Sequence, residues 1–175
     1  MFFLYSLLTA PGVVVHEIGH LFFCLLSGVK IYKIKLFQFN KTVAGFVEHE
    51  EPRYFIQAVL ISFGPLMVNT LLTLFLFAKL TPNYPAWFTS IWTGHDLSLL
   101  WLWLAIAVGL HAIPSTGDAK SLLQTTNGRV LKNPLILIGY PFVLLLYILN
   151  LLKRIHFDFV YVAILFWLGR FYLKV

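Results

Sequence analysis

Five apolar segments constrain the fold of this chain more than any other feature of its sequence. They cover roughly residues 2–27, 54–79, 97–113, 134–152 and 157–173. The first two are long enough to cross a bilayer core with some tilt, and the other three are near the lower limit for a membrane helix. Because a backbone in lipid must satisfy its own hydrogen bonds, such segments predict helices. The sequence therefore predicts an all-α, polytopic membrane protein.

The composition excludes an ordinary soluble domain. Hydrophobic residues make up 59% of the 175 residues and charged residues 11%, which is too few to cover a soluble surface. The net charge of +6 does not indicate nucleic-acid binding, because the basic residues stand singly between apolar segments, where they suit anchoring at a lipid surface. We expect one domain over residues 1–175.

The basic residues between the apolar segments predict an orientation. Lys and Arg occur repeatedly in residues 29–53 and 114–133 and are absent from residues 81–96. The positive-inside rule then places the first two loops in the cytoplasm and the third outside. Five passes would put the N-terminus outside and the C-terminus inside. Lys153 and Arg154 would then lie on the external side, against the rule.

Residues 29–53 also contain a strand pattern. "IYKIKLF" alternates apolar and basic side chains, "NKT" offers a turn, and "VAGFVEH" can return as a second strand. The alternation changes phase between Leu36 and Phe37, which predicts a bulge there. We expect a small β-hairpin over residues 31–47, against the membrane face and directly after the first apolar segment.

Three ionisable side chains interrupt the first apolar segment, within "PGVVVHEIGHLFFCLL". On a helix, His16 and His20 lie one turn apart on the same face, so both imidazoles can reach one metal ion. Glu17 lies about 100° round the helix and can reach a metal-bound water without being a ligand. This is the H-E-x-x-H pattern, in which Zn²⁺ acidifies the water and the glutamate acts as general base.

A chance match, or a polar cluster without metal between helices, would give the same letters, although three ionisable groups in an apolar helix are costly. Catalytic zinc usually takes three protein ligands, so one is missing. Cys24 lies on the same face as His16 but about 12 Å further along the helix axis, which is too far to share one ion. Cys24 is therefore expected to be a small core residue.

Asp118 is the acidic residue best placed to complete the site. It follows the third apolar segment on the predicted cytoplasmic side, after Gly117 and before a helix-forming stretch. The alternative is that Asp118 only caps that helix. His111 either supports a metal ligand or is an ordinary hydrogen-bonded polar residue. The remaining acids outside the first segment are expected at surfaces and interfaces: Glu48, Glu50, Glu51, Asp96 and Asp158.

These motifs together resemble the site-2 protease family of intramembrane zinc metalloproteases. The likeness rests on HEIGH in a membrane helix, on the family's Gly-Pro-x-x-x-Asn signature at Gly64, Pro65 and Asn69, and on an aspartate after the next segment. One difference is the order Gly117-Asp118, because the family commonly has Asp-Gly at this motif.

The resemblance implies a fold and a zinc site. The three-span catalytic core would cover residues 1 to about 125, with peripheral helices over about 134–175. By the family's pattern, His16, His20 and Asp118 would bind the zinc ion. Glu17 would activate the water, and Asn69 would donate a hydrogen bond to the substrate carbonyl or oxyanion. From the residues alone, Asn69 could equally form a hydrogen bond between helices.

The predicted activity is zinc-dependent hydrolysis of peptide bonds in membrane-spanning or membrane-associated proteins. The protein would be a multi-pass protein of a prokaryotic cell membrane, with its active site towards the cytoplasmic side. Its partners would be the lipid bilayer, a membrane protein substrate and a regulatory membrane protein, with no nucleic acid. The alternative is a non-catalytic membrane protein that uses HEIGH for metal binding or transport, although transport would favour more histidines or acids along several spans.

Overall fold

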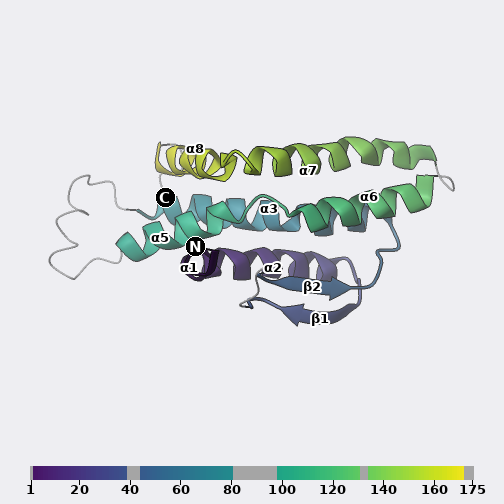
Figure 1. Ribbon diagram of the computed structural model, residues 1–175, viewed down its shortest axis with the longest axis horizontal. Helices are drawn as coiled ribbons and strands as arrows, with labels where there is room; N and C mark the ends of the chain where they lie inside the picture. The colour runs from purple at the N-terminus through teal and green to yellow at the C-terminus, as the bar shows by residue number, and fades with distance from the viewer. Residues whose placement is uncertain (1, 39–43, 81–97, 131–133, 172–175) are drawn as a thin grey trace.

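The computed structural model describes residues 2–38, 44–80, 98–130 and 134–171 (Figure 1). This part of the chain is mostly helical, with one small sheet. The helices are α1 (Phe2–Leu8), α2 (Ala10–Leu26), α3 (Phe55–Ala78), α5 (Ser98–Leu110), α6 (Thr116–Val130), α7 (Gly139–Lys153) and α8 (Phe157–Phe171), with a 3-10 helix η1 (Pro134–Ile138). The mostly helical character and the hairpin confirm those parts of the predicted fold. Asp96 lies outside the described residues.

Helix α3 is the centre of the molecule and contacts α2, α5, α6 and α8. In Figure 1 it lies between α2 on one side and the pair α7–α8 on the other. Small residues let α2 approach it closely: a Cβ on Gly19 would lie 2.8 Å from the Cα of Pro65, and a Cβ on Gly64 would collide with the Phe23 ring. The Gly-Pro pair of the α3 signature therefore packs directly on the helix that carries HEIGH.

Two helical stretches are long and apolar enough to cross a membrane, Phe55–Ala78 and Ile136–Lys153. Two shorter apolar helices, Ala10–Leu26 and Leu99–Leu110, accompany them. Many large apolar side chains on these helices face outward, as lipid-facing side chains would. Membrane association is thus supported by length and composition, and the three-span core stays a prediction.

Strands β1 (Ile31–Lys35) and β2 (Phe46–His49) form the predicted antiparallel hairpin. It lies alongside α2 (Figure 1), so close that a Cβ on Gly45 would lie 2.7 Å from the Cγ of Glu17. The predicted bulge is wrong in position. The register shifts between Ile31 and Lys33, whereas the change of phase lies beyond Lys35, where β1 ends.

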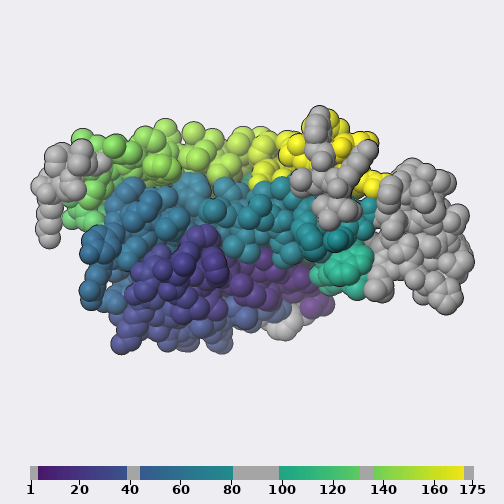
Figure 2. Space-filling model, turned by 180° about the vertical axis from the view of Figure 1, so that it is seen from behind, coloured from purple at the N-terminus to yellow at the C-terminus, as the bar shows by residue number. Residues whose placement is uncertain are grey.

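The last two helices run end to end, in the same direction as α3. At the start of α7, Gly139 lies against the ring of Phe55, the first residue of α3. At the end of α8, Arg170 Nη1 donates a hydrogen bond of 2.9 Å to the carbonyl of Leu80, just beyond the other end of α3. Figures 1 and 2 show the two helices as one band along the length of the molecule. The two segments therefore do not reverse direction between them, as the five-pass topology would require.

The junction between the two helices explains the misplaced basic residues. Helix α7 ends at Lys153, Arg154 caps it, and His156 has a left-handed φ of 59° before α8 begins at Phe157. Lys153 and Arg154 thus lie midway along the α7–α8 band and not in an external loop. Their conflict with the positive-inside rule came from assuming a turn at this point.

The direction of α8 predicts on which side of a membrane the chain ends. With α3 crossing the bilayer, we expect cysteines introduced singly at Lys30 and Arg170 to react with an impermeant maleimide from opposite sides, in a Cys24→Ala background. The Lys/Arg bias places the Lys30 side in the cytoplasm. Labelling of both positions from the same side would contradict the end-to-end arrangement.

Candidate metal centre

The HEIGH residues lie on the buried side of α2. The exposed fractions are 9% for His16, 7% for Glu17 and 8% for His20, within a helix whose neighbouring faces are apolar. The two imidazole rings meet edge to face, with centroids 5.0 Å apart. The two histidines therefore lie on a common face of α2, as predicted.

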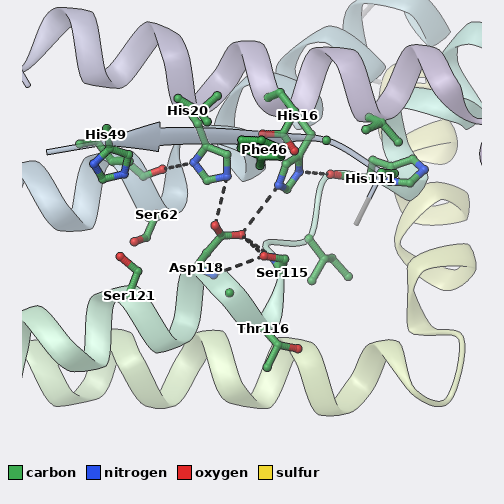
Figure 3. A pocket seen from close by; sticks show the side chains of 18 of the residues that line it. His16, His20, Phe46, His49, Ser62, His111, Ser115, Thr116, Asp118 and Ser121 are labelled. Atoms are coloured by element: carbon green, nitrogen blue, oxygen red, sulfur yellow. Dashed lines mark hydrogen bonds and ion pairs between the residues drawn. The ribbon is translucent and has the colours of Figure 1, made fainter. Parts of the chain in front are cut away.

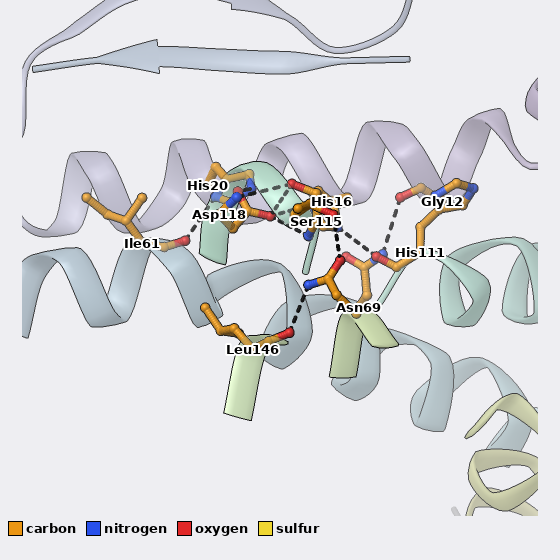
Figure 4. Close-up of polar contacts among 11 residues, drawn as sticks. Gly12, His16, His20, Ile61, Asn69, His111, Ser115, Asp118 and Leu146 are labelled. Carbon is orange, nitrogen blue, oxygen red and sulfur yellow. Dashed lines mark hydrogen bonds and ion pairs between the residues drawn. The ribbon is translucent and has the colours of Figure 1, made fainter. Parts of the chain in front are cut away.

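A backbone carbonyl from another segment fixes each histidine. His16 Nδ1 lies 2.7 Å from the carbonyl oxygen of His111, and His20 Nδ1 lies 2.9 Å from that of Ile61 (Figure 4). A carbonyl can only accept, so both Nδ1 atoms carry the proton. In the neutral form of each ring, the lone pair then lies on Nε2, which is the tautomer that binds a metal.

Both carbonyls are available because regular helix bonding fails at these two points. Pro65 stands four residues after Ile61 and has no backbone N–H, so the Ile61 carbonyl lacks its usual helical donor. His111 follows the last residue of α5, where helix-end carbonyls have no partner within the helix. The proline of the signature thus has a direct structural use: it frees the acceptor that orients His20.

Asp118 reaches the histidines from the first turn of α6. Its Oδ1 lies 3.2 Å from His20 Nε2, and its Oδ2 lies 3.8 Å from His16 Nε2 (Figure 3). Asp118 Oδ2 also accepts hydrogen bonds from the backbone N–H and the hydroxyl of Ser115, at 2.6 and 2.7 Å. The Asp118 N–H is 3.3 Å from Ser115 Oγ, which closes a reciprocal cap at the start of the helix.

The two interpretations of Asp118 are therefore compatible. One face of its carboxylate caps α6 together with Ser115, and this cap aims the other face at the histidines. Burial acts to raise the pKa of Asp118, but the charge of His20 and the hydrogen bonds from His16 and His20 outweigh it and hold the pKa far below the ordinary value. A carboxylate that stays ionised suits a cation.

The three side chains form a group that could hold a metal ion, with ligand atoms all within 4.8 Å of one another. Zinc bonds of roughly 2.0–2.2 Å in a tetrahedron would place neighbouring ligand atoms about 3.3–3.6 Å apart. The distances of 3.2 and 3.8 Å from the histidine nitrogens to Asp118 lie close to that spacing. The donor set of two imidazoles and one carboxylate fits zinc and leaves a fourth position for water.

A cavity of about 580 Å³ gives access to this group (Figure 3). Glu17 lines it beside the histidines and Asp118. Strand β2 and the residues just before it form one wall, and hydroxyl side chains and one lysine form others: Ser62, Ser115, Thr116, Ser121 and Lys153. The cavity thus combines a metal-binding group, an extended strand and polar side chains.

Asn69 does not line this cavity. It is fully buried, and its amide nitrogen donates to the carbonyls of Gly12, at 3.2 Å, and Val108, at 2.9 Å. These hydrogen bonds join α3 to α2 and to α5. The contacts are those of an interhelical tie, and the catalytic role of Asn69 stays a prediction.

His111, predicted either to support a metal ligand or to be an ordinary polar residue, contacts His16 through its backbone carbonyl, while its ring Nε2 contacts Thr9 Oγ1 at 2.9 Å. Sequence reasoning missed two other groups near the site. The Ser115 cap carried a readable signal, an S-x-x-D box before a helix. Lys153 reaches the cavity from α7, which no spacing rule could show. Cys24 is fully buried, as predicted for a core residue.

Comparisons with protein-family models, with curated proteins and with solved structures find no match for this chain. The function must therefore be argued from its own residues and from the motifs they form.

We expect Asp118→Asn to lower the zinc content of the purified protein well below one ion per chain. The amide keeps an oxygen that can cap α6 but removes the charge that binds the ion, so the fold should persist. Metal analysis of protein with an unchanged circular dichroism spectrum is the measurement. Glu50→Gln, at an exposed acid, is the matched control and should keep its zinc. If Asp118→Asn still bound one zinc ion per chain, Asp118 would act only as a helix cap.

Pro65→Ala tests the freed carbonyl. Alanine restores an N–H that competes with His20 for the Ile61 carbonyl, so the zinc dissociation constant should rise roughly 10- to 100-fold, as for other lost supports of metal ligands. Competition with a fluorescent chelator measures it. Pro114→Ala, outside α3, is the control. An unchanged constant in Pro65→Ala would show that His20 needs no help from the proline.

Proposed function

We propose that this chain is an intramembrane zinc metalloprotease that hydrolyses peptide bonds of membrane-spanning or membrane-associated proteins. The observation that carries the proposal is the convergence of His16, His20 and Asp118 beside Glu17 in one cavity. Three protein ligands and an open fourth position are typical of catalytic zinc, whereas structural sites are closed by four protein ligands.

The residues divide the reaction between them. Zinc in such a ligand set acidifies a bound water and polarises the carbonyl under attack. Glu17, which is one residue from His16 and lines the same cavity, would take the proton from the attacking water and deliver it to the departing amine nitrogen. The hydrogen bonds at the two Nδ1 atoms, and those from Ser115 to Asp118, would keep the three metal ligands oriented during this transfer.

The resemblance to the site-2 protease family supports the same chemistry. Its two signatures stand on α2 and α3, and Gly19 of HEIGH packs against Pro65 of the second signature. An aspartate follows the next apolar helix, which completes the order of the family's motifs along the chain. The apolar outer surface supports a membrane setting, and the proposal includes a multi-pass position in a prokaryotic cell membrane with the site towards the cytoplasm.

Strand β2 is the feature best suited to receive a substrate. A protease needs an extended peptide, since a helix hides its carbonyls in its own hydrogen bonds. Within the described ranges, β2 pairs with β1 on one edge only, and β2 residues line the cavity. An unwound substrate segment could add to the free edge through main-chain hydrogen bonds, next to Glu17.

Glu17→Gln separates a protease from a metal-binding or transport protein. Glutamine fills the same volume and cannot take a proton, so we expect bound zinc to remain while peptide cleavage falls by at least about a hundredfold. Co-expression with candidate single-span membrane proteins, followed by detection of cleaved fragments, gives the activity. Metal analysis of the same preparation gives the zinc content. The control is Glu48→Gln in the hairpin, which should cleave normally; equal cleavage by Glu17→Gln and the original protein would overturn the proposal.

A further inference from the structure

Lys153 brings a positive charge into the cavity from outside the predicted catalytic core. It is the last residue of α7, where the band formed by α7 and α8 breaks, and it lines the cavity together with His16, His20 and Asp118. A lysine at such depth in an apolar band is costly unless it has a use.

Hydrogen bonds of Asn150, one turn before Lys153, fix the end of α7 next to the cavity. Thr116 Oγ1, at the start of α6, donates a hydrogen bond of 3.2 Å to Asn150 Oδ1. Asn150 also donates through its amide nitrogen to the Leu146 carbonyl, which holds its side chain in place. Lys153 stands three residues after Asn150 and shares its side of α7. The last turn of α7 is thereby docked on the turn that carries Asp118.

Lys153 does not form an ion pair with a neighbouring acid among the described residues. The charges of Asp158 and Asp118 both act on it, but it forms no ion pair with any acid among the described residues. Asp118 is already held by two histidines and Ser115. Asp158 Oδ1 is buried without a hydrogen-bond partner, so Lys153 does not bond to that oxygen. The ammonium group therefore keeps donors for a ligand in the cavity.

We propose that Lys153 is a substrate-binding residue that selects an acidic side chain close to the scissile bond. The inference rests on the proposed protease function. With zinc bound, Asp118 and Glu17 would face the ion, and Lys153 forms no ion pair with them or with Asp158, so its ammonium group has no acid in direct contact. A glutamate or aspartate of the substrate would supply the missing negative charge and accept the hydrogen bond that Lys153 offers.

Cleavage-site profiling tests the selection. Detergent-purified protein is incubated with a peptide library made by digesting a bacterial proteome, and new termini are identified by mass spectrometry. We expect Asp and Glu to be enriched within three residues of the cleaved bond. Lys153→Gln should remove this enrichment, and Lys153→Glu should replace it with Lys and Arg. Arg154→Gln is the matched control, because Arg154 is the adjacent cation, is exposed and does not line the cavity.

A binding measurement separates selection from turnover. In the Glu17→Gln background, a fluorescent peptide taken from the cleaved set should bind about tenfold more tightly than its Glu→Gln counterpart, which is the range for a hydrogen bond to a charged group. Lys153→Gln should make the two affinities equal.

Three outcomes would count against these proposals in different ways. Cleavage without an acidic preference, or a preference that survives Lys153→Gln, overturns the role of Lys153 and leaves the protease function standing. A lower melting temperature with unchanged selectivity would make Lys153 a structural partner of Asp158, and it also overturns the inference. No metal-dependent cleavage by the original protein overturns both.

Discussion

The candidate metal centre depends on two hydrogen bonds, from the Nδ1 atoms of His16 and His20 to backbone carbonyls of other segments. A carbonyl inside a regular helix is already paired with the N–H four residues later. The chain supplies two exceptions, one before Pro65 and one where α5 ends. Packing α3 and the α5–α6 junction against α2 is what brings those carbonyls to the histidines. The apolar fold and the polar site are therefore built by the same contacts.

Much of the site could be predicted because it depends on local spacing. The four-residue separation of His16 and His20 fixes their common face whatever the rest of the chain does. Asp118 was expected from its place after the third apolar segment, in spite of the reversed Gly-Asp order, and the Ser115 cap shows why that order is compatible with a ligand. What spacing could not show was which distant carbonyls would meet the imidazoles, because that depends on how helices pack.

The arrangement of the last two helices could not be predicted from hydrophobicity. An apolar segment shows that a helix is buried or lies in lipid, but not in which direction it runs. A break of three residues after Lys153 allows either a reversal or a continuation. The contacts of Gly139 and Arg170 with opposite ends of α3 show a continuation. The sequence did contain a sign of it, since a reversal placed Lys153 and Arg154 against the positive-inside rule.

The Gly-Pro-x-x-x-Asn signature on α3 divides into separate physical tasks. Gly64 lets the Phe23 side chain of α2 approach, Pro65 frees the Ile61 carbonyl for His20, and Asn69 ties α3 to both neighbouring helices. All three tasks position α2, and none requires contact with a substrate. These contacts leave Asn69 outside the lining of the cavity, so its predicted donation to a substrate would need a contact that this structure does not contain, and that role stays a prediction. In this structure, all three residues support the helix that carries His16 and His20.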